Sequence, residues 1–125
     1  MILLVEDDAD VREMMKEALE HRGYPVVEAR NGAEALAVLE HERPCLMILD
    51  LVMPVVTGWQ VLDAMHARAL TGVPVCVISA FADRAPHEVA GTLRKPFALQ
   101  DLLGFAERFC PHRADRAGEV RAADG

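Results

Sequence analysis

Carboxylates, a hydroxyl and an ammonium group follow apolar runs of strand length along this chain. They are Glu6, Asp7 and Asp8 after the first run, Asp50 after the third, Ser79 after the fourth and Lys95 after the fifth. Carboxylates gathered at one place repel one another, and a hard divalent cation such as Mg²⁺ relieves that repulsion. A lysine and a hydroxyl nearby could hold the oxygens of a phosphoryl group. Asp50, which ends the most apolar run, is the candidate nucleophile.

Five apolar runs alternate with stretches of helical apolar spacing. The runs are Ile2–Val5, Pro25–Ala29, Cys45–Leu49, Val73–Ile78 and a weaker one at Thr92–Arg94. The helical stretches are Val11–Leu19, Asn31–Leu39, Gly58–Ala69 and Leu99–Phe109. Strands that alternate with helices predict an α/β fold with a parallel sheet. Ligands bind outside the carboxyl ends of such strands, so the polar side chains should meet at one edge.

The pattern within each run indicates its place in the sheet. The first, third and fourth runs are apolar throughout, which is typical of strands covered on both faces. The second and fifth runs include Glu28 and Arg94, so we expect them at the two edges. Asn31 and Glu34 have the spacing of a capping box, which predicts that a helix begins there.

The composition is that of a globular protein with an acidic surface. Of 125 residues, 52% are hydrophobic and 26% are charged, which suits one domain with its own core. Thirteen bases against 20 acids give a net charge of −7, which would repel a nucleic-acid backbone. No apolar run approaches the roughly 20 residues of a membrane span, and no signal peptide is visible. We therefore expect a cytoplasmic protein that binds neither nucleic acid nor membrane.

The three cysteines, Cys45, Cys76 and Cys110, are odd in number and lack the spacing of a metal site. Two of them lie within apolar runs, so we expect reduced thiols in a cytosolic core rather than a disulfide framework. Residues 111–125 are small, polar and balanced in charge. They are predicted to form a disordered tail after a domain of residues 1–110.

Each polar residue also has a simpler explanation when it is taken alone. The acids Glu6, Asp7 and Asp8 could serve only to begin a helix, Ser79 could be a helix cap, and Lys95 a surface charge. Their occurrence together at successive strand ends favours a site. A phosphatase with a strand-end aspartate nucleophile needs a second acid two residues later, where this chain has Val52. A dinucleotide site needs a glycine-rich turn after the first strand, and this turn is acidic.

The motifs at the strand ends resemble those of the receiver domain of bacterial two-component response regulators. The matching segments are Leu3–Asp8 (LLVEDD), Ile48–Pro54 (ILDLVMP), Gly58, Ile78–Ala80 (ISA) and Lys95–Phe97 (KPF), within residues 1–110. The resemblance implies a doubly wound, flavodoxin-like, five-stranded parallel sheet with strand order 2-1-3-4-5. It also implies that Asp50 accepts a phosphoryl group, in a Mg²⁺-dependent reaction that the domain itself catalyses, and that this switches a protein interaction surface.

The same resemblance assigns roles to individual residues. Asp7 and Asp50 would bind Mg²⁺ directly, Glu6 mostly through water, and Val52 through its backbone carbonyl. Lys95 would pair with Asp50 or its phosphate, and Ser79 would be the switch hydroxyl. The peptide bond between Lys95 and Pro96 would be cis. The phosphoryl donor would be a sensor histidine kinase or a histidine phosphotransfer protein. The output would be a downstream protein target, and the domain would be a monomer or a weak dimer.

Two departures from the family pattern concern the output side. The stretch from Ser79 to Lys95 is shorter than the family norm by more than one helical turn and contains Pro86, which predicts a shortened, displaced or partly unwound fourth helix. Thr92 stands where the family has its switch aromatic, and Ala98 replaces the usual acidic cap of the last helix. These departures leave open a second interpretation, a pseudo-receiver that acts as an interaction module without being phosphorylated.

Overall fold

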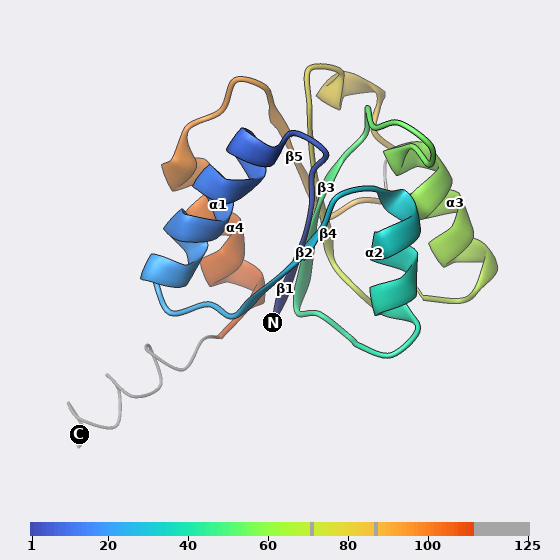
Figure 1. The fold of residues 1–125 in the computed structure, drawn as a ribbon, viewed down its shortest axis with the longest axis horizontal. Coiled ribbons are helices and arrows are strands. Elements are labelled where there is room, and N and C mark those ends of the chain that lie inside the picture. The colour runs from blue at the N-terminus through green and yellow to red at the C-terminus, as the bar shows by residue number, and fades with distance from the viewer. Residues whose placement is uncertain (71, 87, 112–125) are drawn as a thin grey trace.

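The computed structural model describes residues 1–70, 72–86 and 88–111. Its parallel sheet has five strands in the order β2-β1-β3-β4-β5, as predicted. The strands are β1 (Ile2–Val5), β2 (Val26–Ala29), β3 (Leu46–Asp50), β4 (Val75–Ser79) and β5 (Gly91–Arg94). The helices are α1 (Ala9–His21), α2 (Gly32–Leu39), α3 (Gly58–Ala67) and α4 (Leu99–Phe109). Figure 1 shows α1 and α4 on one face of the sheet and α2 and α3 on the other.

The core forms two layers, one on each face of the sheet. Every residue of β1, β3 and β4 is buried, whereas β2 and β5 are the edges and are partly exposed, as their sequences predict. Met15 and Leu19 of α1 are fully buried on the face that α4 also covers. Leu39 of α2 and Val61 of α3 are buried on the opposite face. The hydrophobic effect of covering both faces therefore holds the central strands in place.

The strand register brings four strand ends to one edge of the sheet. Val5 of β1 lies opposite Leu49 of β3, so that Glu6 and Asp50 are at the same level. Asp50 lies opposite Ile78, and Ser79 lies opposite Arg94, which immediately precedes Lys95. The carboxyl ends of the parallel strands thus present the polar residues together, as the sequence predicts.

Side chains at the helix N-termini fix where the helices begin. The Asp8 carboxylate accepts hydrogen bonds from Asp10 N and Val11 N, at 2.9 and 3.2 Å, and caps α1. Asn31 caps α2 by accepting from Glu34 N at 2.9 Å, but the Glu34 side chain accepts from Arg30 N instead of the cap. The predicted capping box is therefore only half formed. A complete one, which sequence analysis missed, joins Thr57 and Gln60 at α3.

The segment between β4 and β5 contains no α-helix among its described residues. The predicted shortened fourth helix is reduced to a single 3₁₀ turn, Ala82–Arg84. The indole N–H of Trp59 in α3 donates a hydrogen bond to the Arg84 carbonyl at 3.3 Å, which links the 3₁₀ turn to α3. An apolar groove of about 620 Å³ lies beside this segment, lined by residues that include Leu62, Met65, Val73, Val75, Pro86 and Val89.

The expectation that all the cysteines are reduced is wrong for two of them. A disulfide joins Cys45, directly before β3, to Cys110, directly after α4, with Cα atoms 5.4 Å apart. The two residues are 65 positions apart in sequence, and they meet because α4 packs back along the sheet and ends beside the start of β3. Spacing along the chain could not reveal this contact. Cys76 of β4 is buried and has a free thiol, as expected.

Two further expectations concern parts of the chain beyond this architecture. The predicted tail of residues 111–125 lies outside the described residues except for Pro111, so the domain boundary stays a prediction. Among the helices that the structure describes, none is long and apolar enough to cross a membrane.

Candidate functional site

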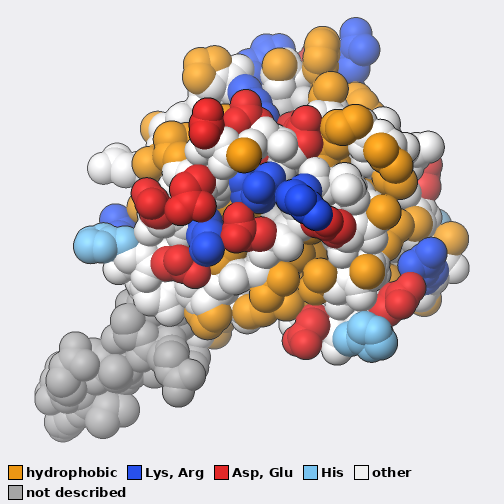
Figure 2. Space-filling view, in the orientation of Figure 1, with side chains coloured by type: hydrophobic (Ala, Val, Ile, Leu, Met, Phe, Trp, Pro, Cys, Tyr) orange, Lys and Arg blue, Asp and Glu red, His pale blue; other side chains and the backbone are white. Residues whose placement is uncertain are grey.

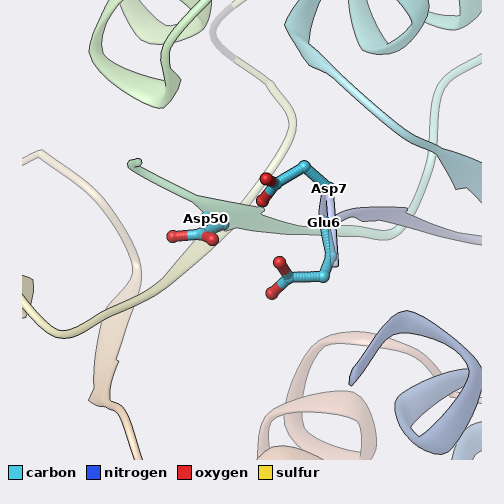
Figure 3. A group of neighbouring side chains, drawn as sticks. All are labelled: Glu6, Asp7 and Asp50. Atoms are coloured by element: carbon cyan, nitrogen blue, oxygen red, sulfur yellow. The ribbon is translucent and has the colours of Figure 1, made fainter. Parts of the chain in front are cut away.

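Three carboxylates converge beyond the ends of β1 and β3. Glu6 and Asp7 follow β1 directly, and Asp50 is the last residue of the neighbouring strand β3. Figure 3 shows their side chains around one space, and one oxygen from each lies within 4.8 Å of the others. Glu6 and Asp50 are buried, and Asp7 is exposed. One small ion could therefore contact all three while remaining open to solvent.

Lys95 reaches into the same space from the end of β5. Its ammonium group donates to Glu6 Oε1 at 2.8 Å and to Asp50 Oδ2 at 3.1 Å. Burial lowers the pKa of Lys95, but the hydrogen bonds and negative charges of Glu6 and Asp50 outweigh it and raise that pKa overall. Lys95 therefore stays protonated and offsets part of the repulsion between the carboxylates.

Glu6 is the most perturbed acid of the site. Its removal from water raises its pKa from 4.5 to about 7, and the negative charge of Asp50 adds to the rise. Hydrogen bonds from Lys95 and from Asp8 N, the latter at 3.1 Å, act in the opposite direction. The Glu6 carboxyl group therefore titrates near neutral pH in the metal-free protein.

Backbone contacts hold Asp50 and Ser79 at their strand ends. The second oxygen of Asp50, Oδ1, accepts from Val52 N at 3.2 Å. The buried Ser79 hydroxyl accepts from Phe81 N at 3.0 Å and keeps its own proton to donate. Gly58, the first residue of α3, packs directly against the Asp50 carbonyl and donates its N–H to Leu51 O at 2.9 Å.

Arg12 of α1 is a site-supporting residue that sequence analysis missed. Its guanidinium donates to the Glu6 carbonyl at 2.8 Å and pairs with Glu28 of β2 at 3.1 Å. Lys16 also pairs with Glu28, at 3.2 Å. Figure 2 shows acidic and basic side chains intermixed over this face of α1 and β2. A base one turn into the helix that follows the acids is the sequence signal that could have indicated Arg12.

The donor set suits a hard divalent cation. Carboxylate oxygens are the ligands that Mg²⁺ prefers, and an exposed Asp7 leaves room for the waters that Mg²⁺ retains. The structure therefore brings together four of the predicted site residues, Glu6, Asp7, Asp50 and Lys95, and places Ser79 on the adjacent strand. The role of the Val52 carbonyl as a ligand stays a prediction.

Comparison with known proteins identifies the family. The family described as "Response regulator receiver domain" matches residues 2–107. The chain belongs to this family and is a receiver domain of the two-component type, with a CheY-like flavodoxin fold. Receiver domains are signalling domains rather than conventional enzymes.

Individual relatives agree with this assignment. The response regulator MprA of Mycobacterium ulcerans is 37% identical over 109 residues, which cover 82% of this chain and 46% of that protein. The chain spans about half the length of the curated relatives it matches. A CheY-like receiver domain protein from Methanospirillum hungatei has a TM-score of 0.77 and 26% identity, covering 86% of this chain and 91% of its own. The regulator TrrA of Thermotoga maritima, solved with Mg²⁺ and BeF, has a TM-score of 0.76 and 27% identity, covering 86% and 96%.

Proposed function

We propose that this domain accepts a phosphoryl group on Asp50 from the phosphohistidine of a sensor kinase or a histidine phosphotransfer protein. The observation that carries the proposal is the placement of Lys95, whose ammonium bridges Asp50 and Glu6 at the sheet edge. A carboxylate flanked by a lysine ammonium and a bound cation can receive a phosphoryl group, because the two positive charges offset the repulsion between the anions.

In the proposed transfer, an oxygen of Asp50 forms a bond to phosphorus as the bond from phosphorus to the donor imidazole breaks. The electron pair of the broken bond stays on the imidazole nitrogen. Lys95 and the Ser79 hydroxyl would donate hydrogen bonds to the phosphoryl oxygens. Hydrolysis of the resulting acyl phosphate by water would release inorganic phosphate and return Asp50 to its carboxylate form. In this proposal the domain catalyses both steps on itself.

Glu6, Asp7, Asp50 and the Val52 carbonyl would hold the cation that this transfer requires. When it is bound, Mg²⁺ would supply positive charge against the phosphoryl oxygens. The solved structure of TrrA with Mg²⁺ and BeF supports this part of the proposal, because that relative shares the fold.

Incubation with Mg²⁺ and a small acyl phosphate, followed by intact mass measurement, tests the proposal. We expect one phosphoryl adduct on the wild-type chain and at least tenfold less on Asp50→Asn. Asp63→Asn, which removes an exposed acid of α3, is the matched control and should be phosphorylated normally. An undiminished adduct on Asp50→Asn would contradict the assignment of Asp50. No adduct on the wild type at any Mg²⁺ concentration would favour a pseudo-receiver.

The domain is proposed to act in the cytoplasm. Its proposed partners are a kinase or phosphotransfer protein and a downstream protein target. The acidic charge and the absence of a spanning helix among the described residues support a partner that is neither nucleic acid nor membrane. We propose a monomer or weak dimer. Cell fractionation and sedimentation at micromolar concentration test these points, and a membrane-bound or stably oligomeric protein would contradict them.

A further inference from the structure

The Cys45–Cys110 disulfide lies at the opposite end of the sheet from Asp50. Cys45 precedes β3, the strand that Asp50 ends, so the two residues are roughly 16 Å apart along one extended segment. Cys110 follows the last residue of α4. The disulfide therefore fastens the final turn of the last described helix to the start of the central strand.

The end of α4 beyond Ala106 buries less of its surface than the middle of the helix does. The helix buries Leu102, Leu103 and Ala106 against the sheet, whereas Glu107 and Arg108 are exposed and Phe109 is only partly buried against the core. Its ion pair to α1, Arg22 with Glu107, is 3.4 Å long and largely exposed, so it adds little. The disulfide therefore contributes more to the position of the end of α4 than to the position of the middle of the helix.

The two cysteines differ in their exposure to solvent. Cys110 is buried, whereas Cys45 is half-buried and its Sγ lies 3.3 Å from the Met1 carbonyl oxygen. A small thiol would reach the disulfide at Cys45. Cys76 is no competitor, because burial raises the pKa of its thiol to about 12 and leaves almost no reactive thiolate at neutral pH.

We propose that Cys45 and Cys110 are a reversible thiol–disulfide site that fastens the end of α4 when oxidised and releases it when reduced. In the oxidation, a thiolate of the pair attacks a low-molecular-weight disulfide, which forms a mixed disulfide and releases one small thiolate. The second thiolate of the pair then attacks the mixed disulfide and displaces the second small thiolate. One sulfur–sulfur bond forms in the protein, one breaks in the reagent, and two small thiols are released with the two protons of the pair.

The continuous core and the proposed location of the domain favour reversibility over a permanent cross-link. The core is continuous on both faces of the sheet, so a domain of this size does not need a staple to fold. A disulfide in a reducing compartment is usually transient, and this step rests on the cytoplasmic location proposed above. Phosphoryl acceptance at the far edge of the sheet should be unchanged by the redox state of the pair.

Counting free thiols tests whether the site exists and reverses. The full chain is equilibrated in mixtures of oxidised and reduced glutathione, quenched in acid, alkylated in denaturant and weighed intact. We expect one alkyl adduct in oxidising mixtures and three in reducing ones, with the same midpoint from both directions. Three adducts in every mixture would show that the disulfide does not form. One adduct even in excess reduced dithiol would show a permanent cross-link, and either result overturns the proposal.

Hydrogen exchange tests the release of α4. On reduction we expect faster exchange at residues 103–109, unchanged exchange in α2, and a melting temperature lower by roughly 10 °C. Cys45→Ser, at the half-buried position, should resemble the reduced form in all mixtures, and Cys110→Ser is a second variant with the same expectation. Cys76→Ser is the control that keeps the response. Identical exchange in α4 of both forms would overturn the proposal, whatever the outcome of the Asp50 experiment.

Discussion

At the scale of single residues, Glu6 connects the site to pH because it is buried with a pKa near 7. The folded-state pKa lies above the ordinary value of 4.5, so between these two pH values the folded protein binds a proton that the unfolded chain does not. The contribution of Glu6 to stability is therefore most favourable below about pH 4.5 and is lost as the pH rises through 7.

We predict that the metal-free protein loses stability from this group as the pH rises from about 4.5 to about 7, by about 3 kcal/mol at most. Glu6→Gln removes the titration and keeps the shape, so its stability should depend less steeply on pH. Urea unfolding in the presence of a chelator, at several pH values, measures the difference between the two proteins. Parallel pH profiles for wild type and Glu6→Gln would contradict the burial-driven shift.

Other residues of the site depend on the same balance of burial and charge. Lys95 stands between two buried carboxylates that would otherwise repel each other, and Arg12 holds the Glu6 backbone from the α1 side. Removing either partner of a buried ion pair leaves an uncompensated charge, which costs more than the pair contributes. The polar residues of this edge therefore act as a connected group.

At the scale of the elements, the start of α3 determines the position of Asp50. A methyl group on Gly58 would meet the Asp50 carbonyl and, at 2.6 Å, Leu51 Cα, and backbone atoms cannot move aside as a flexible side chain would. The helix can approach the end of β3 this closely only because residue 58 has no side chain. The phosphoacceptor proposed here is thus placed by helix packing as well as by its strand.

We predict that Gly58→Ala destabilises the domain by about 1–3 kcal/mol, because α3 or β3 must shift. Gly104→Ala is the matched control: Gly104 is exposed within α4, and nothing lies within 4 Å of the added methyl group. It should leave stability unchanged or raise it by roughly 0.5–1 kcal/mol through helix propensity. Urea unfolding of both variants checks this, and equal effects of the two substitutions would contradict the close-packing argument.

At the scale of the whole molecule, a cation bound at the sheet edge would link β1 to β3. Any ligand that binds the folded state alone stabilises it by mass action, by about 2.7 kcal/mol at a concentration of 100 times its Kd. The relief of repulsion among Glu6, Asp7 and Asp50 would act in the same direction.

We therefore predict that Mg²⁺ raises the melting temperature by several degrees and that Asp7→Asn loses most of this rise. Asp7 is exposed, so its substitution should not disturb the metal-free fold. Asp63→Asn, which changes the charge equally but lies on α3, should keep the full Mg²⁺ response. Thermal unfolding with magnesium chloride and with a matched sodium chloride series measures the effect. A rise of the same size in Asp7→Asn would place the cation elsewhere.

The sheet and its acidic edge could be predicted from the amino-acid sequence. Apolar runs of strand length and helical stripes are local patterns, and they predicted all five strands and both edge strands. The strand order came from the family resemblance. The acids at the strand ends could be placed together because parallel strands share one carboxyl edge. The short stretch between Ser79 and Lys95 predicted a shortened, displaced or partly unwound fourth helix, and the described residues there form only the 3₁₀ turn Ala82–Arg84.

Contacts between distant parts of the chain were decided by the tertiary structure alone. Cys45 and Cys110 meet across 65 residues because of where α4 ends, and Lys95 pairs with Glu6 across 89 residues because β5 ends beside the acidic edge. The pKa of Glu6 likewise depends on burial by neighbours that no local pattern identifies. The spacing of apolar residues along the chain indicates whether a segment is a helix or a strand. These contacts depend instead on how one helix or strand packs against another.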